Sequence, residues 1–391
     1  MKTKLCTLVV CLAFLFTLFL TAGPVAANNS GKKMKAGFIY VGPAGDYGWT
    51  YAHDQGKKMA EKNIPSLETV IVESVAESDA MRIIDRLIQQ QKCDVVFTTS
   101  FGYMNDTIKA GKKYPNKKFM HCSGFKRSDN VGTYFGELYQ IYYLNGLMAG
   151  ALTKTNRIGY VAAFPTPELI RHINAFTLGA RATNPNIEVD VKWIYAWYGP
   201  DKAKEAAEAL ITEGCDALAF SEDTPAVIEV GQAHSEKGKQ IYTFSHYSAM
   251  QPYGEDSVVS GQLINWGDMY TKLVKEMQAD TWNPKEDIWW RIKEGAARLG
   301  GNEKDAINPK FVPELKAKIV DTPDLGKISA YDLVMKRYDQ MKQGVEVFDP
   351  FTGPIKDNTG QIQIKAGEKA DKDDLLSISY YVEGVNGKIP Q

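Results

Sequence analysis

The chain has 391 residues, 44% of them hydrophobic, and its 46 basic and 47 acidic side chains leave a net charge of -1. This length and composition predict two medium-sized domains with large apolar cores. The balanced charge offers no basic surface for nucleic acid, and the three cysteines after residue 27 exclude a disulfide framework.

The first 27 residues have the pattern of a secretory signal. Lys2 and Lys4 precede an apolar run from Leu5 to Leu20, and small residues then lead to Ala27. We expect cleavage near Ala27. A membrane anchor is the alternative, but the apolar run is shorter than the ~20 residues that a spanning helix needs. No cysteine is placed for lipid attachment, so a mature protein without a membrane anchor is expected in the periplasm.

From residue 35 onward, short apolar runs alternate with helical patterns. This alternation predicts parallel sheets with crossover helices. The first series has strands at 35–41, 68–75, 93–100 and 117–123, and the second has strands at 157–164, 189–197, 215–221 and 239–245.

The two series resemble each other. "IIDRLIQQQKCDVVFTTS" and "AAEALITEGCDALAFS" share a helix, a Cys-Asp turn and an apolar strand, although any two βα units look somewhat alike. We therefore predict an α/β protein of two Rossmann-like lobes, each with a parallel sheet and with a ligand cleft between them. The expected bounds are 34–128 plus about 258–290 for lobe 1, and 129–257 plus about 291–391 for lobe 2.

The last third departs from simple alternation. A strand at 257–264 precedes a helix, and a second helix precedes "VFDPFTGPIKDNTGQIQIK". This stretch predicts a hairpin, because its turn, Asp357 to Gly360, contains residue types that accept positive φ.

Ligands of open parallel sheets bind outside the carboxyl ends of the strands, so the strand-end loops of both lobes are expected to line the cleft. In lobe 1 these loops contain the candidate binding residues Asp46, Trp49, Phe101 and Tyr103. In lobe 2 and the crossing segments they contain Arg171, Trp197, Tyr198, Glu222, Asp223, Asn265 and Asp268.

The sequence offers little support for catalysis. The five histidines lack metal-ligand spacing, and "GPAGDYG" lacks the glycine spacing of a dinucleotide site, so neither a metal nor a cofactor is expected. Glu222 and Asp223 could act as acid and base in a hydrolase, but paired acids at a strand end more often cap a helix or accept hydrogen bonds from a ligand. We expect a binding protein rather than an enzyme.

The aromatic residues are more informative. Trp49 in one lobe and Trp197 with Tyr198 in the other follow strand ends, where they could sandwich a planar ring. Each tryptophan could instead plug the edge of its lobe.

The remaining polar candidates have two interpretations each. Arg171 could reach the cleft or form a surface salt bridge. Asn265 and Asp268 could bind a ligand edge or cap the following helix.

Several motifs resemble the basic membrane protein family, whose best understood members are purine nucleoside receptors of ABC importers. "GDYGWTYAHDQG" is similar to its first ligand loop, and "YYLNGLMAGALTKTNRIGYV" to its helix entering the second lobe. "FTGPIKDNTG" and "YYVEGVNGKIP" match its closing hairpin and tail. The resemblance implies a type I periplasmic-binding-protein fold and a permease as partner. A monomer is expected, because a protein that delivers a ligand needs no second copy.

In that family the purine is stacked between two aromatic side chains, one from each lobe, and Trp49 and Trp197 stand at the matching places. The charged residues that typically hold the ribose are replaced here by Ser245 and Ile264. This departure from the family pattern favours a purine base over a nucleoside, with adenine as the first choice and Asp223, Asn265 and Asp46 available to its nitrogens. The alternatives are a nucleoside, a sensor that presents its ligand to a membrane receptor, a nucleoside hydrolase, and another planar ligand such as a flavin.

Overall fold

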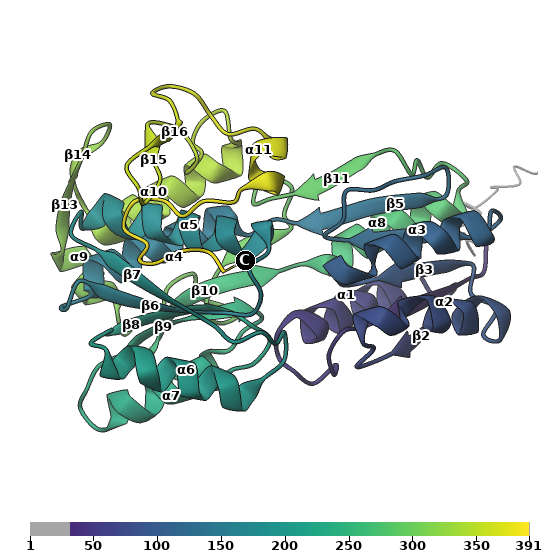
Figure 1. Ribbon diagram of the computed structural model, residues 1–391, viewed down its shortest axis with the longest axis horizontal. Helices are drawn as coiled ribbons and strands as arrows, with labels where there is room; N and C mark the ends of the chain where they lie inside the picture. Colours follow the sequence, from purple (N-terminus) through teal and green to yellow (C-terminus); the bar gives the residue numbers. More distant parts are fainter. Residues whose placement is uncertain (1–31, 391) are drawn as a thin grey trace, which may run out of the picture. The chain divides into compact units, whose positions relative to one another are not determined.

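The computed structural model describes residues 32–390, so the expected signal peptide lies outside the described residues. The described chain contains two six-stranded sheets with flanking helices, which confirms the two predicted α/β lobes (Figure 1).

The first sheet is entirely parallel, in the order β2-β1-β3-β4-β5-β11. Its strands are β1 (Met34–Ile39), β2 (Leu67–Val72), β3 (Val95–Thr98), β4 (Lys118–Cys122), β5 (Val131–Gly136) and β11 (Asp287–Trp290). The helices of this lobe are α1 (Trp49–Asn63), α2 (Ala80–Gln89), α3 (Met104–Lys113) and α8 (Trp266–Gln278). Helix α2 shows why they pack, since Ala80, Ile83, Ile84, Leu87 and Ile88 recur at helical spacing and are all buried.

The second sheet has the order β7-β6-β8-β9-β10-β12, in which only β12 is antiparallel to its neighbour. Its strands are β6 (Arg157–Ala162), β7 (Glu188–Trp193), β8 (Ala217–Ser221), β9 (Tyr242–Tyr247), β10 (Val258–Ile264) and β12 (Ala297–Leu299). The main helices are α4 (Tyr139–Leu152), α5 (Pro167–Thr183), α6 (Pro200–Thr212) and α7 (Ala226–Glu236).

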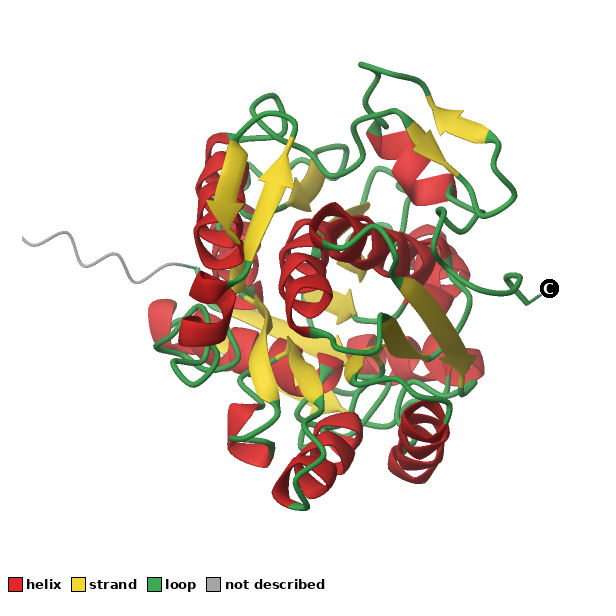
Figure 2. Cartoon of the chain, turned by 90° about the vertical axis from the view of Figure 1, so that its left-hand side faces the viewer, coloured by secondary structure: helices red, strands yellow, loops and turns green. Residues whose placement is uncertain are grey.

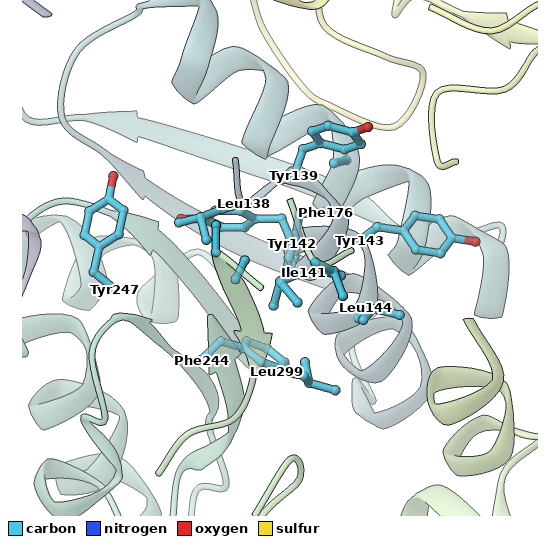
Figure 3. Packing of buried hydrophobic residues seen from close by; sticks show 14 of the residues in the cluster. Leu138, Tyr139, Ile141, Tyr142, Tyr143, Leu144, Phe176, Phe244, Tyr247 and Leu299 are labelled. Carbon is cyan, nitrogen blue, oxygen red and sulfur yellow. The ribbon is translucent and has the colours of Figure 1, made fainter. Parts of the chain in front are cut away.

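Helix α4 is buried along its whole length and forms the centre of lobe 2 (Figure 3). It packs closely against α5 because glycines face one another across the contact. A Cβ on Gly146 would lie 2.0 Å from the carbonyl oxygen of Phe176, and one on Gly179 would lie 2.0 Å from that of Tyr143. The close packing makes α4 and α5 a rigid base for the loops at their ends.

The C-terminal third adds short elements to lobe 2. Two small two-stranded sheets stand apart from its main sheet (Figure 2). They are β13 (Ile319–Thr322) with β14 (Gly326–Ser329), and β15 (Ile355–Lys356) with β16 (Ile362–Ile364), while α9 (Val312–Ala317), α10 (Ala330–Gln343) and α11 (Lys372–Ser377) complete the chain. The β15–β16 pair confirms the predicted hairpin, and Asp357 accepts hydrogen bonds from the backbone of Thr359 and Gln361 in its turn.

The positions at which the chain crosses between the lobes differ from those that the sequence predicted. Strand β5 was not predicted, and it pairs with β4 in the first sheet although we placed residues from 129 onward in lobe 2. Strand β10 pairs with β9 in the second sheet although we placed residues from 258 onward in lobe 1. If each segment is assigned to the sheet in which its strand pairs, lobe 1 consists of the described residues up to 136 together with 266–290. Lobe 2 contains most of the remaining residues. Pairing between strands distant in the sequence decides this membership.

Candidate functional site

The strand-end loops of the two lobes touch each other. The Trp49 N–H at the start of α1 donates to the Asp223 carboxylate after β8, at 3.3 Å. Beside it, the Ser248 hydroxyl donates to the Tyr47 carbonyl. A Cβ on Gly48 would lie 2.5 Å from the Cα of Asp223, so only glycine permits this approach. The two lobes are therefore closed upon each other at this edge.

A pocket of about 310 Å³ lies beside these contacts, and we call it the inner pocket. Lobe 1 contributes Val41, Trp49, Ser100, Phe101 and Ser123, and lobe 2 contributes Glu168, Trp197, Asp223 and Tyr247.

Trp49 is held firmly in the lobe 1 wall of the inner pocket. Its side chain is 7% exposed, and its Nε1–H donates to the Thr99 carbonyl at 2.5 Å. The edges of His53 and Tyr247 contact it, with ring centroids 4.5 and 5.1 Å away. The contacts with Thr99 and His53 lie within lobe 1 and fix the ring plane, whereas Tyr247 reaches the ring from lobe 2 in the closed state.

Trp197 lies in the lobe 2 wall of the same pocket, in the loop between β7 and α6. Its ring is half-buried and packs 5.1 Å from that of Phe164. Its carbonyl accepts a hydrogen bond from the Asp223 N–H at 2.8 Å, which ties the loop to the end of β8. The structure thus brings both predicted tryptophans to one pocket, while their stacking on a ligand stays a prediction.

Asp223 and Glu222 are neighbours in sequence with different surroundings. Asp223 lines the inner pocket, and burial, reinforced by the charge of Asp46, raises its pKa well above the ordinary value. Glu222 is fully buried away from the pocket wall and accepts a hydrogen bond from the Thr224 hydroxyl at 3.0 Å. The two carboxyl groups do not face a common space, so the prediction that Glu222 binds ligand is not supported.

Glu168 is a pocket residue that the sequence analysis missed. It lies in the first turn of α5 and lines the inner pocket between the lobes. Burial, opposed by the charge of Arg171, raises the pKa of Glu168 to about 7. The sequence contained a signal, because Glu168 is an acidic residue in the segment that follows the first strand of the second series, four residues after its predicted end at 164.

Arg171 is buried, and its guanidinium group is already paired with a carboxylate. It is 1% exposed, and it donates to Glu137 at 2.7 Å and to the Leu375 carbonyl at 2.6 Å. Burial would raise the pKa of Glu137, but Arg171 and His172 outweigh it and hold that pKa well below its ordinary value. Glu137 follows β5, where the chain first crosses between lobes, so this ion pair anchors the crossing.

Two predicted lobe 1 ligands have structural roles instead. Asp46 accepts hydrogen bonds from the N–H groups of Gly48, Thr50 and Tyr51, at 2.8 to 3.1 Å, and so caps the start of α1. Tyr103 is fully buried, and its hydroxyl donates to the Val75 carbonyl at 2.6 Å. Phe101, by contrast, is 37% exposed and lines the inner pocket as predicted.

Three further predicted residues lie outside the inner pocket. Asn265 caps α8 by accepting from the Gly267 N–H at 3.1 Å, and its amide donates to Asp268 at 2.7 Å. Tyr198 is 48% exposed and does not line the pocket, although it follows Trp197 directly. The helix-capping interpretation of Asn265 and Asp268 is therefore the one that the structure supports.

Two features bear on other kinds of site. Among residues 32–390, no group of three or more His, Cys, Asp or Glu side chains is placed to hold a metal ion. Within the same residues, no helix combines the length and the apolar character needed to cross a membrane.

The architecture defines the class of protein. Two mostly parallel α/β sheets joined by several crossings, with a pocket between their strand ends, form the type I periplasmic-binding-protein fold. A solute-binding protein of an ABC transporter system from Aeropyrum pernix K1 has this fold, with a TM-score of 0.67 at 16% identity over 88% of this chain and 95% of that one. Another from Conexibacter woesei has a TM-score of 0.59 at 16% identity over 79% of this chain and 96% of the other.

The sequence defines the family within this class. Residues 33–322 match the family model for PnrA-like ABC transporter substrate-binding proteins, and the chain belongs to this Bmp family. A purine-binding protein of Brucella abortus is 37% identical over 93% of this chain and 96% of its own length. A putative ABC transporter glucose-binding protein of Haloferax volcanii is 34% identical over 76% of this chain and 73% of its own.

Proposed function

We propose that this protein binds a purine nucleobase, with adenine favoured, in the inner pocket and delivers it to an ABC permease. The observation that carries the proposal is the meeting of Trp49 and Trp197, from opposite lobes, in one pocket with the carboxyl groups of Asp223 and Glu168. Stacking between the tryptophans would contribute about 1–3 kcal/mol for each ring.

The raised pKa values favour adenine over guanine. A protonated carboxyl group has one donor and one acceptor, and it matches the adenine edge, which offers the acceptor N7 beside the donor N6 amino group. An ionised carboxylate accepts only, so it suits the two adjacent donors, N1–H and the N2 amino group, of guanine. Because burial raises the pKa of Asp223 well above its usual value and that of Glu168 to about 7, the neutral forms are available near pH 7.

The absence of a charged sugar clamp favours a base over a nucleoside. The positions at which the related nucleoside receptors hold the ribose are Ser245 and Ile264 here, and neither lines the inner pocket. The Ser245 hydroxyl already donates to the Gly301 carbonyl at 3.3 Å.

The closed state of the two lobes is the form in which the protein would deliver its ligand to the permease. The contacts of Asp223 with Trp49 and of Ser248 with Tyr47 join the lobes, and a ligand that touches both walls stabilises this state. A permease partner accords with the Bmp family, and the relative from Brucella abortus is named a purine-binding protein. We place the protein in the periplasm as a monomer, after cleavage of the signal near Ala27.

The test is to identify the small molecule that co-purifies with the protein by mass spectrometry, and then to titrate purines calorimetrically. Adenine, adenosine, guanine and guanosine form the panel, and glucose is added because one relative is named for it. We expect adenine to bind most tightly. Tight binding of adenosine or glucose without binding of adenine would overturn the proposal.

A further inference from the structure

A second, larger space opens from the inner pocket, and we call it the outer chamber. Its volume is about 720 Å³. Four residues line both spaces, Phe101, Ser123, Glu168 and Trp197. The outer chamber is therefore a continuation of the inner pocket, and a ligand seated between the tryptophans has room to extend into it.

The wall of the outer chamber is mostly apolar and aromatic. Phe125 and Phe135 line it from lobe 1, Trp289 from β11, and Leu376 from α11 of lobe 2. Phe125 is 54% exposed, so the chamber has an unoccupied aromatic face at its edge. Walls of this kind gain free energy by removing apolar ligand surface from water.

Three of the four charged side chains that line the outer chamber are already paired, and the fourth, Glu168, lies where the chamber meets the inner pocket. Lys372 donates to both carboxylate oxygens of Asp287, and Arg171 is bound to Glu137 and to the Leu375 carbonyl. Lys372 also lies over the Trp289 ring, 4.7 Å from its centroid. A phosphate entering here would have to break these pairs or leave its own charge without a cationic partner.

We propose that the outer chamber takes an apolar substituent carried by the purine, so that the ligand class includes adenines bearing an aromatic or branched alkyl group. This inference rests on the proposed function, because it places the purine ring in the inner pocket. The shared residues Phe101 and Trp197 lie where the ring and its substituent would meet.

The experiment compares adenine with N6-benzyladenine and N9-benzyladenine by calorimetry on the mature protein. The two isomers carry the same benzyl group on different edges of the purine ring, so they test two directions in which it could enter the chamber. Burial of a benzyl group in the chamber should raise the affinity of at least one isomer about tenfold or more over adenine. If both isomers bind more weakly than adenine, the chamber does not accept the substituent and the inference is wrong.

Two variants locate the effect. Leu376→Trp should fill the chamber and remove the advantage of the benzyl compound, while adenine, which does not reach Leu376, should bind as before. Phe125→Ala should lower the affinity for the benzyl compound severalfold, because it removes an aromatic face of the chamber. Ile362→Trp is the matched control, because Ile362 is 59% exposed on β16 and lines neither space.

The outcomes separate this inference from the proposed function. Binding of adenine with weaker binding of both benzyl isomers overturns the inference and leaves the proposed function intact. Failure of adenine and both isomers overturns the proposed function and the inference together. An advantage of a benzyl isomer that survives Leu376→Trp also contradicts the inference, because the substituent would then lie elsewhere.

Discussion

The two walls of the inner pocket differ in kind. The lobe 1 wall presents Trp49, held by the Thr99 carbonyl and by neighbouring rings, together with the neutral side chains of Phe101 and Ser123. The lobe 2 wall presents the half-buried Trp197 and the carboxyl groups that titrate. Under the proposed function, lobe 1 would supply a preformed platform, whereas lobe 2 would recognise the edge of the ring and close over it.

The largest expected effect is that of Trp49→Ala. Removing a buried tryptophan should lower the free energy of unfolding by about 3–5 kcal/mol and the affinity for adenine about tenfold to hundredfold. Urea denaturation and calorimetry measure the two quantities. Trp282→Ala, a half-buried tryptophan of lobe 1 outside the inner pocket, is the control and should keep the affinity. If Trp49→Ala bound adenine with unchanged affinity, the proposal that the purine stacks on Trp49 would be wrong.

Trp197→Ala should separate affinity from stability. Its ring is half-buried, so we expect a loss of about 1–3 kcal/mol in binding but of no more than about 1 kcal/mol in the free energy of unfolding. The same two measurements apply. If Trp197→Ala destabilised the protein as much as Trp49→Ala does, the contrast between the walls would not hold.

The third prediction concerns pH and Glu168. Its pKa is raised to about 7 in the folded protein, so the protonated form that we propose to pair with adenine is lost as the pH rises above 7. Adenine affinity should then fall by up to about tenfold for each pH unit. Glu168→Gln keeps a donor and an acceptor at all pH values, and its affinity should fall less steeply between pH 7 and 8. Equal slopes for the two proteins would exclude Glu168 from proton-linked binding.

The same shift affects stability without ligand. Since the pKa of Glu168 rises from 4.5 to about 7 on folding, the folded state holds the proton more tightly. Protonation of Glu168 therefore adds up to about 3 kcal/mol to the free energy of unfolding below pH 4.5. This stabilisation is lost as the pH rises through 7. Urea denaturation at pH 5 and pH 8 should show a smaller difference for Glu168→Gln than for the unmodified protein.

The smallest effect should come from the contact between the lobes. Ser248→Ala removes the hydrogen bond to the Tyr47 carbonyl, which forms only when the lobes are closed. The affinity for adenine should fall by about 0.5–1.5 kcal/mol, with unfolding of the protein little changed. Ser235→Ala is the matched control, because its hydroxyl bonds within lobe 2 to the Gly231 carbonyl at 2.9 Å. A larger loss in the control than in Ser248→Ala would contradict the role of closure.

The sequence predicted the parts of the fold that depend on local pattern. The alternating strands and helices and the hairpin at Asp357 follow from periodicity and turn chemistry, and they were confirmed. The assignment of β5 and β10 to the wrong lobes has a different origin. A strand of either sheet has the same apolar pattern, and only its pairing partner distinguishes them.

The candidate site was predictable where residue type and position agreed. Trp49 and Trp197 are large apolar side chains at strand ends, and both line the inner pocket. Asp46 and Asn265 make capping hydrogen bonds in the structure, and the sequence left both roles open because a polar residue before a helix suits a cap as well as a ligand. Glu168 was missed because an acid in the first turn of a helix is usual for electrostatic reasons alone.

A crystal structure of the protein grown with adenine tests the central claim most directly. The account predicts a purine ring between the Trp49 and Trp197 side chains, with the Glu168 or Asp223 carboxyl group in hydrogen-bond contact with the edge of the ring. A ring that contacts only one of the tryptophans, or that lies wholly in the outer chamber, would contradict it.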